Sequence, residues 1–291
     1  MNRYFVTGAT GFLGSRVVNR LLKEGAKVYC LRRKSSNLRR VQSLANNLIW
    51  IDAEEVAYNT FFMENPVDCI YHCATDYGRK TVDPYSMIES NLLLPLKILH
   101  NAVAAKVPVF INTDTVLDKR IGPYSLSKHQ FSQWLESYSR EIVGINVATQ
   151  HFYGPGDDET KFTTYIVNSL LDGAASIPLT KGEQCRDFIY VDDVVEAMLK
   201  IMTVSSGLDV GYHEYEVGSG CSISIKDFVQ TAKIKCQNKN TMLDFGALPY
   251  RDGEVMNVIT NTDKLKNLNW QPKFSLEEGL NTMISEMRGC K

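Results

Sequence analysis

The chain has 291 residues, of which 44% are hydrophobic and 22% are charged, the composition of an ordinary globular protein. Its 32 Lys and Arg balance 33 Asp and Glu, so no overall basicity favours nucleic acid or an anionic membrane surface as a partner. The seven Cys include no C-x-x-C pair, so we expect neither a disulfide framework nor a metal site. Because no signal peptide and no membrane-spanning run stand out, we expect a cytoplasmic protein.

Up to about Gln150, short apolar runs rich in β-branched and aromatic residues alternate with amphipathic segments. The apolar runs predict strands near residues 3–7, 27–32, 48–52, 67–73, 107–113 and 145–150. The amphipathic segments predict helices near residues 12–24, 36–45, 58–64, 85–105 and 124–142. This alternation is typical of an α/β fold with a doubly wound parallel sheet.

The pattern changes after Gly154-Pro155-Gly156. Helices are predicted near 161–172, 192–203 and 275–287, and short strands within 176–191. We therefore expect a parallel-sheet domain over residues 1–153 and a smaller α/β domain, mostly for substrate, over residues 154–291. Some segments of the second domain are expected to return to the first sheet.

A glycine-rich turn joins the first predicted strand to the first predicted helix, with glycines in a G-x-x-G-x-x-G pattern. The first glycine permits a tight turn, the second lets the backbone approach a pyrophosphate, and the third lets the helix pack on the strand. The start of the helix offers N–H groups and a positive dipole end to phosphate. A Rossmann dinucleotide-binding domain is expected, and a turn without a ligand is the alternative. The expected cofactor contacts here are Gly8, Thr10, Gly11, Phe12, Leu13 and Gly14.

Two arginines, Arg32 and Arg33, stand at the end of the second predicted strand. Enzymes that prefer NAD usually have Asp or Glu there, whereas guanidinium groups suit the 2′-phosphate of NADP. The residues therefore favour NADPH or NADP over NAD, unless the arginines only form a solvated surface run. Asp52 and Ala53, after the third strand, are expected near the adenine, and a helix cap is the alternative role of Asp52.

Tyr124 and Lys128 form a Y-x-x-x-K pair at the start of a predicted helix, and their spacing puts both on one helix face. A free Tyr has a pKa of about 10. We expect the Lys128 ammonium, together with the cationic nicotinamide ring of an oxidised cofactor, to lower this pKa, so that Tyr124 exchanges a proton with a substrate hydroxyl or carbonyl. Thr113, at the end of the preceding strand, can hydrogen-bond the same oxygen. The alternative is an exposed helical pair without a catalytic role.

These motifs resemble the active site of the short-chain dehydrogenase/reductases, and the similarity to their extended branch covers nearly the whole chain. "HCA" at 72–74, "HFYGPGDD" at 151–158 and "RDFIYVDD" at 186–193 resemble further segments of that branch. Besides the glycine turn, the resemblance implies cofactor contacts at Ala74, Thr75, Asn91, Tyr124, Lys128 and His151. It implies a nucleotide-diphosphate sugar as substrate, bound by Thr75, Asp114, His151, Arg186 and Arg251.

Several of these residues have simpler alternatives. Asn91 resembles the residue that braces the active-site helix, but it would also cap a turn. Arg186 would also be accounted for by an ion pair with Asp187. The sequence departs from the family where His151 replaces an Asn and where the strand end reads Asn-Thr-Asp-Thr from residue 112 instead of a Ser-rich run.

The strand end also bears on the reaction. Related sugar-nucleotide 4,6-dehydratases carry Thr-Asp-Glu there, and Thr115 cannot replace the carboxylate base, which argues against dehydration. The segment is more similar to that of 4-ketoreductases of the CDP-abequose and CDP-paratose synthase type. The resemblance implies NADPH-dependent reduction of a nucleotide-linked 4-keto-6-deoxyhexose in deoxysugar and O-antigen biosynthesis. The base, the 3-hydroxyl and the product stereochemistry stay open.

Two other functions remain as alternatives: an NAD-dependent nucleotide-sugar 4-epimerase, and a non-catalytic dinucleotide-binding regulator. An intact set of Thr113, Tyr124 and Lys128 argues against the regulator, since a sensor needs no proton donor. The family often pairs the helices expected at 85–105 and 124–142 between subunits, so the resemblance implies a homodimer. Their apolar stripes would otherwise belong to the core.

Overall fold

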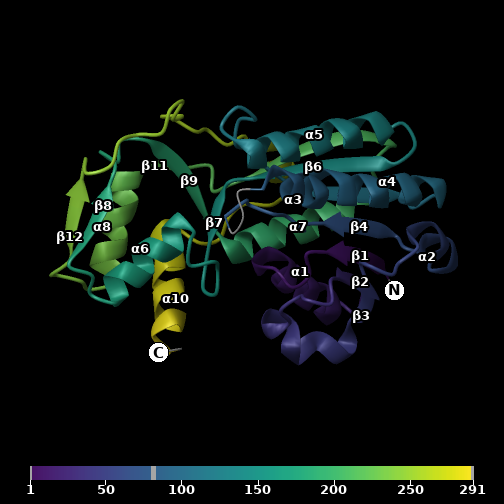
Figure 1. Ribbon diagram of the computed structural model, residues 1–291, viewed down its shortest axis with the longest axis horizontal. Helices are drawn as coiled ribbons and strands as arrows, with labels where there is room; N and C mark the ends of the chain where they lie inside the picture. The colour runs from purple at the N-terminus through teal and green to yellow at the C-terminus, as the bar shows by residue number, and fades with distance from the viewer. Residues whose placement is uncertain (1, 80–82, 290–291) are drawn as a thin grey trace. The chain divides into compact units, whose positions relative to one another are not determined.

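The computed structural model describes residues 2–79 and 83–289 (Figure 1). Its largest sheet consists of β1 (Arg3–Thr7), β2 (Lys27–Arg32), β3 (Ile49–Asp52), β4 (Cys69–His72), β5 (Val109–Thr115), β6 (Val143–Thr149) and β10 (Gly211–Val217). The strand order is β10-β6-β5-β4-β1-β2-β3. The strands from β1 to β6 pair in parallel with their neighbours, which confirms the predicted doubly wound sheet.

The helices that accompany this sheet are α1 (Phe12–Lys23), η1 (Arg39–Asn47), α2 (Tyr58–Glu64), α3 (Pro84–Ile88), η2 (Glu89–Leu93), α4 (Leu94–Ala104), α5 (Pro123–Tyr138) and α7 (Val191–Ser205). The segment predicted as a helix near 36–45 is the 3₁₀ helix η1. The helix predicted over 85–105 is interrupted by η2, which is a turn of π-helix. Pro95 explains this turn, because it has no N–H and its ring collides with the carbonyl four residues earlier.

One apolar cluster fixes α4 and α5 against the sheet. Phe5, Ile70 and Phe110 of the strands meet Ile98 of α4 and Phe131 of α5, and all five are fully buried. Burying a side chain of this size contributes about 1.5–3 kcal/mol. Figure 1 shows α4 and α5 lying side by side, and the packing holds the start of α5 next to the end of β5.

The chain divides into two compact units. The first unit comprises Met1–Thr149 and Val195–Tyr215, and the second comprises Gln150–Val194 and Glu216–Lys291. Among the described residues, no helix combines the length and the apolar character that crossing a membrane requires.

The second unit contains two small sheets and several helices. Its strands are β7 (His151–Tyr153), β8 (Ser176–Leu179), β9 (Cys185–Tyr190), β11 (Ser222–Ser224) and β12 (Met242–Phe245). Its helices, apart from the start of α7, are α6 (Phe162–Leu171), α8 (Ile225–Lys235), α9 (Asp263–Asn267) and α10 (Leu276–Gly289). Phe188 of β9 stacks on Phe228 of α8 with ring centroids 4.2 Å apart, at the centre of this unit's core. The sheet β11-β9-β7 carries two of the residues expected at the substrate.

Candidate active site

The glycine turn of the first unit leaves no room for side chains. Gly8 has a positive φ of 72°, and a Cβ there would lie 2.6 Å from the backbone N of Ala74. A Cβ on Gly14 would lie 2.2 Å from the carbonyl oxygen of Gly8. Gly11 precedes α1 without any side-chain cap, and no acidic residue lies in the first turn of the helix. The turn thus fits the pyrophosphate of a dinucleotide, because backbone N–H groups and the helix dipole face the place where it would lie.

The end of β2 carries the two expected arginines, and further side chains surround them. The guanidinium of Arg32 lies over the ring of Trp50, 4.9 Å from its centroid, and Arg33 is exposed. Asp52 is the register partner of Arg32, and the ammonium of Lys34 lies 3.9 Å from its carboxylate. Trp50 and Lys34 were not expected at this place, since neither belongs to a recognisable motif.

The segment after β4 is attached to β1 through Thr7. The hydroxyl of Thr7 accepts a hydrogen bond from the backbone N of Ala74 at 3.2 Å and pairs with Nδ1 of His72 at 2.7 Å. Burial lowers the pKa of His72 well below its usual value, with a smaller contribution from the charge of Lys128. A neutral His72 therefore holds Ala74 next to the glycine turn.

Asn91 joins this segment to α5. Its side-chain oxygen accepts hydrogen bonds from the hydroxyl of Thr75 at 3.1 Å and from the backbone N of Asp76 at 2.8 Å. Its amide nitrogen donates to the carbonyl of Asp76 at 2.8 Å and to the hydroxyl of Ser127 at 3.0 Å. Asn91 is fully buried, and these four hydrogen bonds hold the two segments together.

The structure brings the expected catalytic side chains to the end of β5 and the first two turns of α5. The hydroxyl of Thr113 donates to the hydroxyl of Tyr71 at 3.1 Å. The ring of Tyr124 lies 5.0 Å from the ring of Tyr77. Lys128 is 1% exposed, so its ammonium is enclosed by the first unit. Tyr71 and Tyr77 were missed by the sequence analysis, because Tyr71 in its apolar run looks like a core residue and Tyr77 belongs to no recognisable motif.

The acidity of Tyr124 differs from the expectation. Burial raises the pKa of Tyr124 well above its usual value, and the nearby Tyr77 and Asp114 raise it further. A hydrogen bond with Thr115 and the charge of Arg79 act in the opposite direction. In the protein without its cofactor the pKa of Tyr124 is therefore raised, because the phenol is desolvated and faces a carboxylate. The expected lowering also depends on the cationic nicotinamide ring, so it stays a prediction for the protein with its cofactor. Tyr124 keeps its proton at neutral pH.

Burial also acts on Lys128 and Asp114. Burial lowers the pKa of Lys128, while Asp114 and Cys73 raise it. The carboxylate of Asp114 is 6% exposed and accepts hydrogen bonds from the backbone N of Thr115 at 2.7 Å and from the side chain of Asn146 at 2.9 Å. Both carboxylate oxygens thus already have protein donors, and a substrate hydroxyl would be an additional partner.

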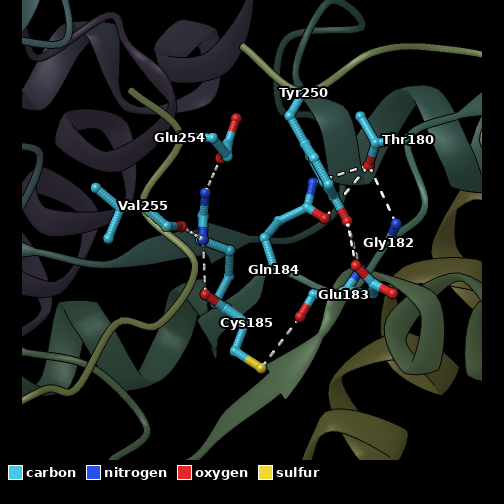
Figure 2. A network of polar contacts seen from close by, with 9 residues as sticks. Thr180, Gly182, Glu183, Gln184, Cys185, Tyr250, Glu254 and Val255 are labelled. Carbon is cyan, nitrogen blue, oxygen red and sulfur yellow. Dashed lines mark hydrogen bonds and ion pairs between the residues drawn. The ribbon is translucent and has the colours of Figure 1, made fainter. Parts of the chain in front are cut away.

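In the second unit, the guanidinium of Arg186 is surrounded by protein acceptors. It donates to the carbonyls of Cys185 and Val255, both at 2.7 Å, and forms an ion pair with Glu254. Figure 2 shows Cys185, Glu254 and Val255 in this network. The alternative of a pair with Asp187 is wrong, since that carboxylate instead accepts from Ser219, Gly220 and Thr260.

His151 and Arg251 lie in the same unit. The ring of His151 on β7 packs on Phe188 at 5.9 Å, and its Nδ1 is buried without a partner among the described residues. Burial lowers the pKa of His151 to about 4, and Arg186 acts in the same direction. Arg251 is exposed in the loop before Glu254. Within the described ranges, no three His, Cys, Asp or Glu side chains gather in a way that could hold a metal ion.

Comparison with known proteins identifies the family. Residues 4–218 match the model of the NAD dependent epimerase/dehydratase family. The chain is 32% identical to CDP-abequose synthase of Salmonella typhimurium and 33% identical to that of Salmonella muenchen, each time over 97% of both chains. The crystal structure of UDP-glucose 4-epimerase from Thermotoga maritima shares the fold, with a TM-score of 0.84 at 24% identity over 99% of each chain. With the glycine turn and the Tyr-Lys pair in place, the chain belongs to the NAD dependent epimerase/dehydratase family, the extended branch of the short-chain dehydrogenase/reductases.

Proposed function

We propose that this protein reduces the 4-keto group of a nucleotide-linked 4-keto-6-deoxyhexose, with NADPH as the hydride donor. The observation that carries the proposal is the similarity over 97% of the chain to two proteins named CDP-abequose synthase. That name indicates a CDP-linked sugar as their product, so CDP is the nucleotide that we favour for this chain. Thr115, in the place of a dehydratase's carboxylate base, supports a reduction instead of a dehydration.

The bound cofactor supplies the hydride that reaches C4 of the sugar. Tyr124 then gives its proton to the C4 oxygen, a role that suits a phenol whose pKa is raised by burial and by Asp114. The buried ammonium of Lys128 stabilises the phenolate that remains. The hydroxyl of Thr113 polarises the carbonyl by donating a hydrogen bond to its oxygen. For this, the hydrogen bond between Thr113 and Tyr71 reverses: Tyr71 becomes the donor, and the proton of Thr113 is free to point at the substrate.

Cofactor contacts are assigned to the glycine turn, to Ala74 and to the end of β2. We assign the 2′-phosphate of NADPH to Arg33, because it is exposed, while Arg32 is held over Trp50. The ammonium of Lys34 pairs with Glu55 at 2.6 Å and lies 3.9 Å from the Asp52 carboxylate of β3. The positive partner that remains for an anionic 2′-phosphate is therefore the exposed guanidinium of Arg33.

The diphosphate of the substrate is assigned to Arg186 and Arg251 of the second unit, with His151 as a neutral hydrogen-bonding group. Two backbone carbonyls hold the guanidinium of Arg186 in one orientation. A bound diphosphate would replace Glu254 as the negative partner of the Arg186 guanidinium. Arg251 is exposed, so its guanidinium is accessible to an anionic group.

A homodimer is proposed for the helices beside the candidate site. Trp134 on α5 is 45% exposed and Leu93 on η2 is 52% exposed. Leu126 of α5 and Ile88 of α3 are exposed as well. Exposed apolar residues on neighbouring helices are typical of an interface, and sedimentation of the purified protein tests it.

A 4-epimerase with tightly bound NAD is the second candidate. The observation that favours it is the 27% identity over 94% of this chain to a protein named probable UDP-arabinose 4-epimerase 3 from Arabidopsis thaliana. An epimerase would use the same Thr113, Tyr124 and Lys128, but it would consume no external NADPH.

The test mixes the purified protein with NADPH and with CDP-, dTDP-, GDP- and UDP-linked 4-keto-6-deoxysugars, and follows absorbance of the reduced nicotinamide. Consumption of NADPH with one nucleotide, CDP first, is the expected result. No consumption with any substrate, together with NAD bound to the protein as purified, would overturn the reductase in favour of the epimerase.

A further inference from the structure

Two buried asparagines connect Lys128 to Asp114 through the centre of the large sheet. Asn112 on β5 and Asn146 on β6 are register partners, 0% and 2% exposed. The amide nitrogen of Asn112 donates to the side-chain oxygen of Asn146 at 2.7 Å. Nζ of Lys128 lies 3.5 Å from the side-chain oxygen of Asn112, and the amide nitrogen of Asn146 donates to Asp114 at 2.9 Å. We call these two side chains the amide pair.

The charges at its two ends determine how the amide pair is oriented. An ammonium only donates hydrogen bonds, so Lys128 requires the oxygen of Asn112. A carboxylate only accepts them, so Asp114 requires the amide nitrogen of Asn146. Turning either amide over would oppose two donors or two acceptors. Because aligned hydrogen bonds polarise one another, the amide pair is matched to a cation at one end and an anion at the other.

Packing alone does not account for the amide pair. Three of its neighbours along the strands, Ile111, Ile145 and Val147, are fully buried and apolar, as expected inside a parallel sheet. Burying an amide costs free energy unless its hydrogen bonds are made. Two apolar side chains of similar size would fill the same space without that cost. What the amides add is a fixed connection between two charged groups.

The charged groups at the two ends of the amide pair lie at the candidate catalytic residues: Lys128 is itself one of them, and Asp114 affects both Tyr124 and Lys128. The groups that face Tyr124 are Tyr77, Arg79, Asp114 and Thr115, and those that face Lys128 are His72, Cys73, Asn112 and Asp114. Asp114 belongs to both sets. It raises the pKa of Tyr124 and that of Lys128, so its position affects which of the two holds a proton.

We propose that Asn112 and Asn146 are positioning residues for catalysis, which hold the Lys128 ammonium and the Asp114 carboxylate in place beside Tyr124. The proposal rests on the proposed function, in which Tyr124 is the proton donor. Without Asn146, the carboxylate of Asp114 loses one of its two donors and its charge moves or weakens. Without Asn112, the buried ammonium of Lys128 loses an oxygen acceptor.

The test uses Asn112→Leu, Asn146→Leu and the double variant of the full chain. Each single change is expected to lower kcat about tenfold or more, because misplaced catalytic groups cost rate, with little change in KM. The double variant leaves no orphaned amide between its two sites, so it is the one best able to fold. If the two residues act as one unit, their effects do not add, so the kcat of the double variant should be no lower than that of the less active single variant.

The pH profile separates positioning from a purely structural role. Asp114 raises the pKa of Tyr124, so a weaker field from Asp114 lets Tyr124 lose its proton at lower pH. The alkaline limb of kcat/KM in Asn146→Leu should therefore move to lower pH by about one unit. The control is Asn65→Leu, which removes a partly buried amide bonded to Phe61 and Tyr29, and it should keep the wild-type kcat and profile.

A readout without turnover keeps the inference separate from the proposed function. Protein containing 3-fluorotyrosine, with the Tyr124 signal assigned by Tyr124→Phe, reports by fluorine NMR the pH at which that phenol ionises. If Asn146→Leu lowers this pH while the wild type reduces none of the 4-keto sugars, the positioning role of the amide pair is supported and the proposed function fails. If the wild type is active but the folded double variant keeps its kcat and its Tyr124 titration, the inference is overturned.

Discussion

Replacing Tyr124 by Phe removes one hydroxyl and keeps the ring that lies 5.0 Å from Tyr77. The folded state loses a hydrogen bond with Thr115, which is worth about 1 kcal/mol. Turnover loses a general acid, and such groups contribute about 100- to 10,000-fold. That loss corresponds to about 3–5 kcal/mol of activation free energy. We therefore expect Tyr124→Phe to fold and to bind NADPH normally but to be nearly inactive.

The assay measures NADPH consumption, NADPH affinity by fluorescence, and thermal unfolding. Tyr138→Phe is the matched control, because it removes a hydroxyl that lies 3.1 Å from His100 at the other end of α5. It should keep wild-type turnover. If Tyr124→Phe retained turnover within about tenfold of the wild type, the phenol would not be the proton donor, and the assignment would be refuted. If the wild type bound NADPH without any turnover, the regulator would regain support.

Three further predictions concern other parts of the chain. Gly14→Ala puts a Cβ 2.2 Å from the Gly8 carbonyl, so calorimetry should show a loss of about 1–3 kcal/mol and fluorescence a weaker NADPH affinity; unchanged values would contradict the tight turn. Arg33→Ala should raise the KM for NADPH about tenfold and leave that for NADH unchanged, whereas an equal change in both would remove Arg33 from the 2′-phosphate site. The pKa of His151 is lowered from 6.5 to about 4, so its contribution to stability is complete above pH 6.5 and is lost as the pH falls towards 4. Urea unfolding at about pH 4.5 should reveal an acid-dependent loss of about 2 kcal/mol that His151→Asn lacks, and an equal loss in both would exclude His151 as its source.

The sequence analysis was most accurate where the structure depends on near neighbours in the chain. The alternation of apolar runs and amphipathic segments predicted the parallel strands, because buried strands have a characteristic composition. The helix predicted near 275–287 begins at a capping box, since the hydroxyl of Ser275 accepts from the backbone N of Glu278 and the Glu278 carboxylate accepts from the backbone N of Ser275. The π turn at η2 was missed, although Pro95 was a local signal for it.

Partners that lie far apart in the sequence were the main omission. Asn112 ends one apolar strand run and Asn146 interrupts another, and neither run indicates that the two amides meet. The same holds for Arg186 and Glu254, which are 68 residues apart. Pairing of this kind depends on strand register and loop path, which no local pattern encodes.

What the sequence determined by itself is therefore the type of fold, the tight glycine turn before α1 and the place of Tyr124 and Lys128 at the start of α5, because backbone sterics and periodicity are local properties. Only the tertiary structure decided the direction in which the two pKa values shift in the protein alone. Burial and the nearby carboxylate of Asp114 raise the pKa of Tyr124, and burial lowers that of Lys128. Desolvation depends on everything that packs around a group, so it is defined only once the chain has folded.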